Sequence, residues 1–228
     1  MLKKLRPFFT GHYNLLLLCL TLLFIFRPYD LGFFYLGIWK LLLTMVFFSA
    51  IFNVNHPRVV KTITGFLMIP ALLLTWLNLF HPMEVLFVSD ATLTATFILI
   101  CTGSIVSDVL VRSKVNLETL RGVICAYFMV GFAFAYIYYL IEYVSPDSFH
   151  LIQRVSTFSF NQYLSEMLYY SFVTLLTIGF GDITPLKNAA QTATIIEGII
   201  GQFYIAILVA RLVSVYAFYQ SKMFQKKG

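Results

Sequence analysis

Six apolar stretches, each about as long as a membrane-spanning helix, constrain this chain more than any other feature. They are residues 8–26, 32–52, 63–80, 91–109, 123–143 and 189–216. Crossing the hydrocarbon layer takes about 20 mostly apolar residues, and only a structure that satisfies its own backbone hydrogen bonds is stable there. The first stretch is the weakest, because polar residues dilute its first half. We therefore expect an all-α polytopic membrane protein with six transmembrane helices.

The composition excludes an ordinary soluble domain. Of the 228 residues, 60% are hydrophobic and 11% are charged, whereas a globular chain carries about 25% charged residues. The three cysteines, Cys19, Cys101 and Cys125, lie inside apolar stretches and share no Cys-x-x-Cys spacing. They are expected to be buried, unreactive thiols and not a disulfide framework.

The positions of the basic residues predict the orientation of the chain. Twelve of the 16 Lys and Arg residues lie at stretch ends that share one side of the membrane. They are Lys3, Lys4, Arg6, Arg58, Lys61, Arg112, Lys114, Arg121, Arg211, Lys222, Lys226 and Lys227. The opposite side holds only Arg27, Arg154 and Lys187, so the positive-inside rule places both termini in the cytoplasm. The net charge of +6 then reflects topology, and we expect a lipid bilayer and no nucleic acid as partner.

The segment between the last two stretches, residues 144–188, is expected to be external. It contains a short amphipathic run over residues 161–175, which is too short to span the bilayer. A segment that enters the apolar zone and returns must be buried in protein or line water, because unpaired backbone groups in lipid cost several kcal/mol each. We therefore predict a re-entrant helix here.

The run that follows this helix carries the chemistry. In Thr177–Asp182 two glycines, Gly179 and Gly181, alternate with larger residues. Glycine adopts backbone angles forbidden to other residues, so such a strand can hold successive carbonyl groups on one side, where they replace the water around a cation. The Thr177 hydroxyl adds a ring of oxygens at the inner end, and Asp182 places a carboxylate at the outer mouth. These are the parts of an ion-selectivity filter.

The run Thr177–Asp182 resembles the filter of the potassium channels, which reads T-V-G-Y-G-D or variants such as T-I-G-F-G-D. The context is similar too, since a short re-entrant helix precedes the run, one span flanks each side and Pro185 follows. The resemblance is specific over residues 123–216, while residues 1–122 resemble the peripheral domain of six-helix channels only in helix number. It implies a four-helix peripheral domain over residues 1–122 and a pore domain over residues 123–228.

The resemblance further implies a homotetramer, because the family's filter surrounds each potassium ion with four strands. Thr177, Ile178, Gly179 and Phe180 would supply the carbonyl rings, and Gly181 the outer turn. Potassium is then the permeant ligand, and no cofactor is expected.

Other positions take their roles from the same resemblance. Tyr169, Tyr170 and Thr174 fall on the pore helix, where they would support the filter. Phe180 stands where most members have Tyr, so a bracing hydroxyl is missing and we expect a less firmly held filter. Val173 stands where some members have a Glu that pairs with the mouth aspartate, so Asp182 lacks that partner.

In the last stretch, Gly201 lies at the spacing of the family's gating hinge. The alternative is a packing glycine, a role that we expect for Gly198. The residues that would face the central cavity in the family's register are Gln202, Ile205, Ala206, Val209 and Ala210.

Several charged residues lie inside the apolar stretches. Glu197 is read first as a structural carboxyl bonded to the pore helix, and alternatively as a proton-sensitive brace. Lys40 lies near mid-depth in the second stretch, and its partner cannot be read from the sequence. His150 is a candidate for sensing external pH.

The fourth stretch, residues 91–109, contains no Lys or Arg, so we predict no strongly voltage-dependent gate in it.

The most economical function is passive, selective conduction of potassium through a homotetramer, by a protein that is not an enzyme. Metalloprotease, Walker and Rossmann motifs are absent from the sequence. One alternative is a weakly selective monovalent cation channel, and another is a polytopic transporter in which Gly-Phe-Gly-Asp is incidental. By analogy, the short tails and loops indicate a prokaryotic plasma (inner) membrane.

Overall fold

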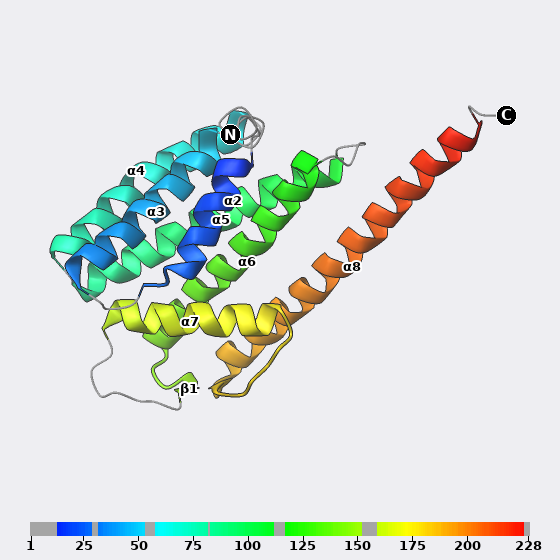
Figure 1. Ribbon diagram of the computed structural model, residues 1–228. Coiled ribbons are helices and arrows are strands. Elements are labelled where there is room, and N and C mark those ends of the chain that lie inside the picture. The colour runs from blue at the N-terminus through cyan, green and yellow to red at the C-terminus, as the bar shows by residue number, and fades with distance from the viewer. Residues whose placement is uncertain are drawn as a thin grey trace.

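The computed structural model describes residues 13–28, 32–52, 58–81, 83–111, 117–151 and 159–225. This part of the chain is almost entirely helical (Figure 1). Its helices are α2 (Asn14–Ile25), α3 (Phe33–Phe52), α4 (Arg58–Phe80), α5 (Glu84–Val111), α6 (Leu117–Val144), α7 (Phe160–Leu175) and α8 (Asn188–Gln225). Its strands are β1 (Phe149–Leu151) and β2 (Ile183–Pro185).

Five described helices are long and apolar enough to cross a membrane, namely α3, α4, α5, α6 and α8. The helix α2 is equally apolar, but its 12 residues are too few to span, and residues 1–12 lie outside the described part. The expected all-α membrane fold is therefore confirmed with five spans. The sixth predicted span is represented by α2 alone.

The helices form a bundle from which α8 diverges. In Figure 1, α2 to α5 lie side by side, α6 borders them, and α8 runs away from α6 toward the C-terminus. The helix α5 packs along both α4 and α6, and α2 contacts α3 and α6. Burial follows this arrangement, because 67% of the spanning window of α6 is buried but only 11% of that of α8.

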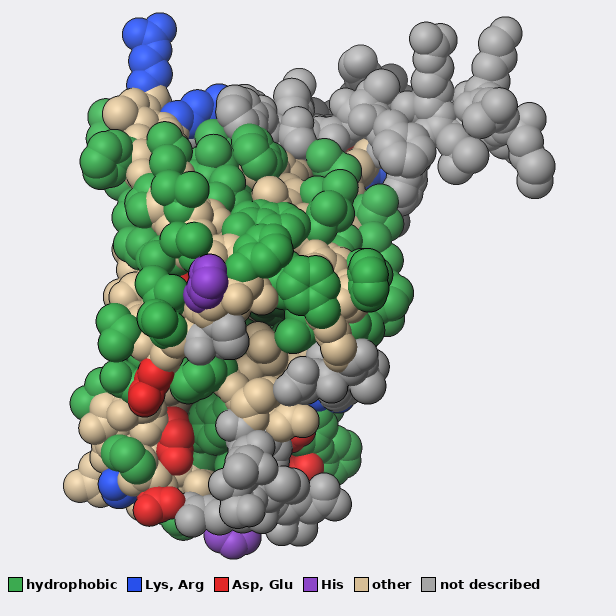
Figure 2. Space-filling model, turned by 90° about the vertical axis from the view of Figure 1, so that its left-hand side faces the viewer, with side chains coloured by type: hydrophobic (Ala, Val, Ile, Leu, Met, Phe, Trp, Pro, Cys, Tyr) green, Lys and Arg blue, Asp and Glu red, His purple; other side chains and the backbone are tan. Residues whose placement is uncertain are grey.

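Charged side chains lie unevenly on the molecule. Figure 2 shows hydrophobic side chains over the middle of one face, with acidic side chains confined to its lower half. Lys and Arg side chains lie at the upper end and at isolated points lower down. The apolar middle is what a helix bundle must present to hydrocarbon.

The short helix α7 lies across the lower ends of α2 and α6 (Figure 1). It begins with a capping box, in which the Ser159 hydroxyl accepts from the Gln162 amide nitrogen and the Gln162 side chain accepts from the Ser159 amide nitrogen. Its Phe172 ring packs against α6 at Gly131, where a Cβ would lie only 2.7 Å from the ring. The same ring contacts Phe24 of α2, so α7 is held by both neighbours.

Two short antiparallel strands, which the sequence did not predict, lie beyond the C-terminal end of α6. Phe149 of β1 lies opposite Pro185 of β2, and Leu151 lies opposite Ile183. Before β1, the Glu142 carboxylate accepts hydrogen bonds from the backbone nitrogens of residues 147, 148 and 149. The strand pair thus ties the end of α6 to the segment that follows residues 177–182.

The buried Lys40 finds its partners in the peripheral helices. Its ammonium group donates to the Thr75 carbonyl oxygen at 2.7 Å, and the Thr75 hydroxyl donates to the Asp90 carboxylate at 2.6 Å. Asn78 and Thr94 also donate to that carboxylate, each at 3.4 Å. A buried cation and a buried anion are therefore linked across α3, α4 and α5, as burial of charge requires.

Candidate ion-conduction site

The end of α7 directs the chain into the strand predicted to form the filter. The carbonyl of Thr174 accepts from the Thr177 nitrogen at 2.9 Å, and that of Val173 accepts from the Ile178 nitrogen at 2.9 Å. These bonds occupy carbonyls that a helix leaves unpaired at its C-terminus, and they turn the chain away from the helix axis. The Thr174 carbonyl thus helps to set the direction in which the chain leaves α7.

The φ angle alternates in sign along the backbone of this strand. Thr177, Gly179 and Gly181 have φ of +58°, +61° and +78°, while Ile178 and Phe180 between them keep negative φ. In an ordinary strand successive carbonyls point to opposite sides, and alternating the sign of φ is what allows them to face one side. The two glycines accept this geometry freely, whereas a β-branched threonine with positive φ is strained by about 1–3 kcal/mol. Such strain is typical of functional sites.

The side chains of the strand are not covered within one chain. Ile178 is 49% exposed and Phe180 is 68% exposed. Both line a groove of about 380 Å³ between the end of α2 and the exposed side of α7. Large apolar side chains left exposed at one place are typical of an interaction surface.

The outer end of the strand is anchored through Asp182. One carboxylate oxygen accepts from the Tyr169 hydroxyl at 2.6 Å, and the other accepts from the Ile183 backbone nitrogen at 3.0 Å. Tyr169 lies one helical turn before Val173, so its hydroxyl takes the place of the glutamate missing there. Asp182 therefore has a pore-helix partner, which the sequence did not predict. The hydrogen bond to Asp182 raises the pKa of Tyr169 to about 12, so the hydroxyl stays protonated near neutral pH.

A fully buried carboxyl lies behind the strand. Glu197 of α8 contacts the Tyr138 hydroxyl of α6 and the Ser171 hydroxyl of α7, both at 2.5 Å. The Ser171 hydroxyl also donates to the Gly131 carbonyl oxygen at 2.7 Å. The carboxyl is therefore bonded to the pore helix, as its structural interpretation predicted, and it joins α6, α7 and α8 at one point.

Residues 122–217 match a family model described as "Ion channel". This part of the chain is therefore similar to an ion-channel domain. It comprises nearly all of α6, the whole of α7 with the strand after it, and most of α8. The resemblance, drawn over residues 123–216, is thereby confirmed. A comparison with curated proteins found no match.

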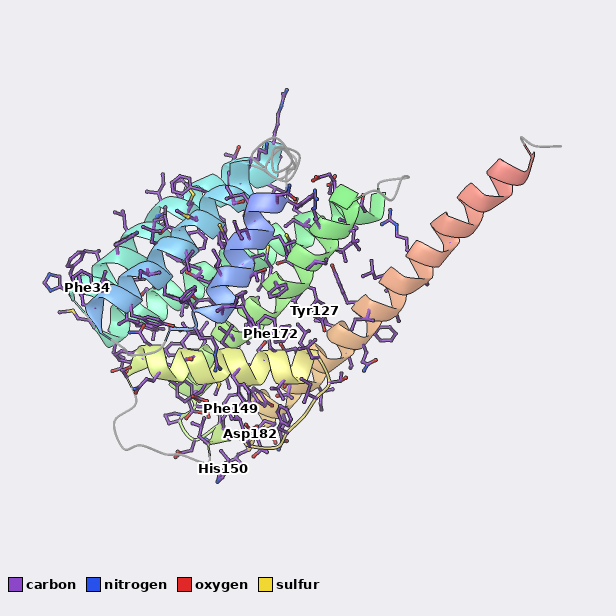
Figure 3. The ribbon with its side chains drawn as sticks, in the orientation of Figure 1. Phe34, Tyr127, Phe149, His150, Phe172 and Asp182 are labelled. Atoms are coloured by element: carbon purple, nitrogen blue, oxygen red, sulfur yellow. The ribbon has the colours of Figure 1, made fainter. Side chains whose placement is uncertain are left out.

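Tyrosine hydroxyl groups link α7 to both of its flanking helices. The Tyr127 hydroxyl donates to the Leu175 carbonyl oxygen at 2.9 Å, and its ring lies 5.4 Å from that of Tyr204. Near the middle of α7, the Tyr170 hydroxyl is 2.8 Å from the Thr194 hydroxyl of α8. Figure 3 shows Tyr127 and Phe172 on the side of α7 that faces α6, with Asp182 and His150 on the other side. The flanking helices thus hold the pore helix at several points.

The two glycines of α8 differ in how closely they are packed. A Cβ on Gly201 would lie 2.5 Å from the Leu175 carbonyl oxygen, whereas a Cβ on Gly198 would meet nothing within 4 Å. The packing role expected for Gly198 therefore belongs to Gly201 within this chain. Close approach at this point sets the distance between α8 and the end of the pore helix.

The remaining predicted residues have these positions. Gln202, Ile205, Ala206 and Ala210 are exposed along α8, whereas the Val209 side chain lies outside the described residues. His150 is exposed on β1. Among the described residues, no group of three or more His, Cys, Asp or Glu side chains is arranged to hold a metal ion.

Sequence reasoning missed several members of the site, namely Tyr127, Tyr138, Ser171 and Thr194. They carry no motif, because each is a polar residue inside an apolar helix. The available signal was Glu197, since a buried carboxyl requires hydroxyl or amide donors from its neighbours. That requirement does not say which of the many hydroxyl side chains of α6 and α7 are the donors.

Proposed function

We propose that this protein conducts potassium ions passively and selectively through the strand Thr177–Gly181. The observation that carries the proposal is the alternating backbone of that strand at the end of the short helix α7, within the segment that matches the ion-channel family model. Aligned carbonyl oxygens replace the hydration shell of a potassium ion. The Thr177 hydroxyl extends this set of oxygens inward, and Asp182 attracts cations to the outer mouth.

The conducting unit is a homotetramer. One strand per chain cannot surround an ion, and the exposed Ile178 and Phe180 side chains support burial against other copies. The sparse burial of α8 supports the same arrangement, since its apolar face, including Ile199 and Phe203, has no partner in one chain. In the assembly Gln202, Ile205 and Ala206 line the cavity, and Gly201 combines tight packing with a hinge.

The protein lies in a prokaryotic plasma membrane with both termini in the cytoplasm. The distribution of basic residues supports this orientation. No basic residue occurs in α5. Because a voltage sensor needs several cations in the membrane field, gating by α2–α5 is at most weakly voltage-dependent.

The Glu197 cluster is a candidate for proton-sensitive bracing of the filter. Ser171 has one hydroxyl proton but two oxygen neighbours, the Gly131 carbonyl and the Glu197 carboxyl. A protonated carboxyl can donate to Ser171 while Ser171 donates to Gly131, whereas an ionised one competes with Gly131 for the same proton. The charge on Glu197 therefore selects between two hydrogen-bond patterns behind the filter.

The deciding experiment is potassium flux into liposomes that contain the purified protein. We expect flux faster than transporter turnover, and its loss in Gly179→Ala, in which a methyl group is added at a residue of positive φ. Size-exclusion chromatography of that variant verifies that it still assembles. Bi-ionic reversal potentials separate a selective channel from a weakly selective one. Transporter-like rates, or flux that survives Gly179→Ala, would refute the proposal.

A further inference from the structure

The external end of the first helix reaches the mouth of the filter. The guanidinium carbon of Arg27, just after α2, lies 5.7 Å from the centroid of the Tyr169 ring on the pore helix. The hydroxyl of that ring holds the Asp182 carboxylate at 2.6 Å. A cation, an aromatic ring and the mouth aspartate therefore form one chain of contacts from a peripheral helix to the pore.

The end of α2 is fixed where it makes this contact. The Tyr35 hydroxyl of α3 donates to the Arg27 carbonyl oxygen at 3.0 Å. One turn earlier, the Phe24 ring lies 4.6 Å from the Phe172 ring of the pore helix. Arg27 is thus placed by contacts on either side of it, and its position depends on how α2 and α3 sit against α7.

The charges around the contact complement each other. Glu166 lies one turn before Tyr169 on the pore helix, and burial raises the pKa of its carboxyl while Arg27 opposes that rise. Asp182 adds a second acidic group close by. Arg27 brings a positive charge to this acidic side of the pore helix, and the cation is attracted to the face of the Tyr169 ring.

The groove beside the strand connects the same elements. Arg27 and Phe24 form one of its walls, while Tyr169 and the filter residues Ile178 and Phe180 form the other. A shift of α2 therefore changes both the Tyr169 contact and the space beside Phe180.

We propose that Arg27 is a positioning residue for the outer end of the filter. Its cation orients the Tyr169 ring, whose hydroxyl then holds Asp182 and the outer turn at Gly181. The peripheral helices thereby influence the stability of the filter from the external side, without a charged fourth helix. This inference rests on the proposed function in that it treats residues 177–181 as the filter.

The test compares Arg27→Gln with Lys187→Gln in patch recordings of current decline during maintained activity at low external potassium. Lys187 is a second external cation and contacts Ser145 and Pro146, away from Tyr169. Both variants remove one positive charge, so they change the surface potential alike. We expect decline about two- to fivefold faster in Arg27→Gln, the range for an exposed cation–π contact. Lys187→Gln should match the wild type, and Arg27→Lys should largely restore it.

A second background shows whether Arg27 acts through the hydroxyl of Tyr169. Tyr169→Phe keeps the ring but loses the bond to Asp182, so adding Arg27→Gln to it should change the decline less than twofold. An equal effect of Arg27→Gln in both backgrounds would contradict the inference, as would identical behaviour of Arg27→Gln and Lys187→Gln.

Amide hydrogen exchange of the purified protein decides the matter independently of conduction. The Ile183 nitrogen is bonded to Asp182, so Arg27→Gln should accelerate exchange around residues 181–183 and leave α2 unchanged. Faster exchange in α2 alone would reduce Arg27 to a structural role. A wild type that conducts no potassium would refute the proposed function, while the exchange data would still decide whether Arg27 positions this segment.

Discussion

Replacing Gly201 with alanine tests how the inner helix meets the pore helix. The new Cβ would lie 2.5 Å from the Leu175 carbonyl oxygen, whereas ordinary contact begins near 3.4 Å, so α8 and the end of α7 must separate by about 0.9 Å. Overpacking of this kind costs about 1–3 kcal/mol. The same carbonyl accepts the Tyr127 hydroxyl, and weakening that bond adds about 0.5–1.5 kcal/mol.

We therefore expect Gly201→Ala to lose about 2–4 kcal/mol of stability and most of its potassium flux, because the displaced carbonyl lies two residues before Thr177. The matched control is Gly198→Ala on the same helix, where a Cβ meets nothing within 4 Å of the chain. It should melt at or above the wild-type temperature, since alanine favours a helix by up to about 1 kcal/mol over glycine. Thermal melting in detergent and flux in liposomes measure the two effects. A Gly201→Ala protein as stable as the wild type but altered in open probability would refute the packing argument and leave only a hinge.

Three further outcomes are expected. Glu197→Ala removes the carboxyl that accepts from the buried Tyr138 hydroxyl and leaves Ser171 only the Gly131 carbonyl oxygen as acceptor, so it should cost about 1–3 kcal/mol in melting experiments, whereas the isosteric Glu197→Gln should cost less than half of that. Asp90→Asn removes the negative group near the buried Lys40 and should cost about 3 kcal/mol; melting should recover when Lys40→Met is added, and an additive double variant would disprove the coupling. The raised pKa of Tyr169, about 12, means that its bond to Asp182 is complete below the ordinary tyrosine pKa and is lost only as pH rises toward 12. Current decline should therefore be the same at external pH 7 and pH 9, and a change that disappears in Tyr169→Phe would contradict this.

The sequence predicted what is encoded locally. Runs of apolar residues predicted the membrane-spanning helices. The spacing of Gly179 and Gly181 predicted where the backbone adopts positive φ. Helix ends were less accurate, since α5 begins at Glu84 and not at residue 91. Polar residues near the membrane surface extend a helix without adding to its apolar run.

What could not be predicted depends on contacts between distant segments. Gly198 and Gly201 are equivalent in the sequence, and only the approach of Leu175 distinguishes them. The positive φ of Thr177 runs against the local preference of a β-branched residue, so the surrounding fold imposes it. The partners of Lys40 lie on two other helices, and the strands β1 and β2 are too short to show a pattern.

The uncovered flank of Thr177–Gly181 has a genetic consequence. If each side of the pore comes from a separate subunit, one defective subunit impairs conduction by every oligomer that contains it. A cell that makes normal and defective products together would then lose far more than half of its permeability, and a single altered allele would behave as dominant.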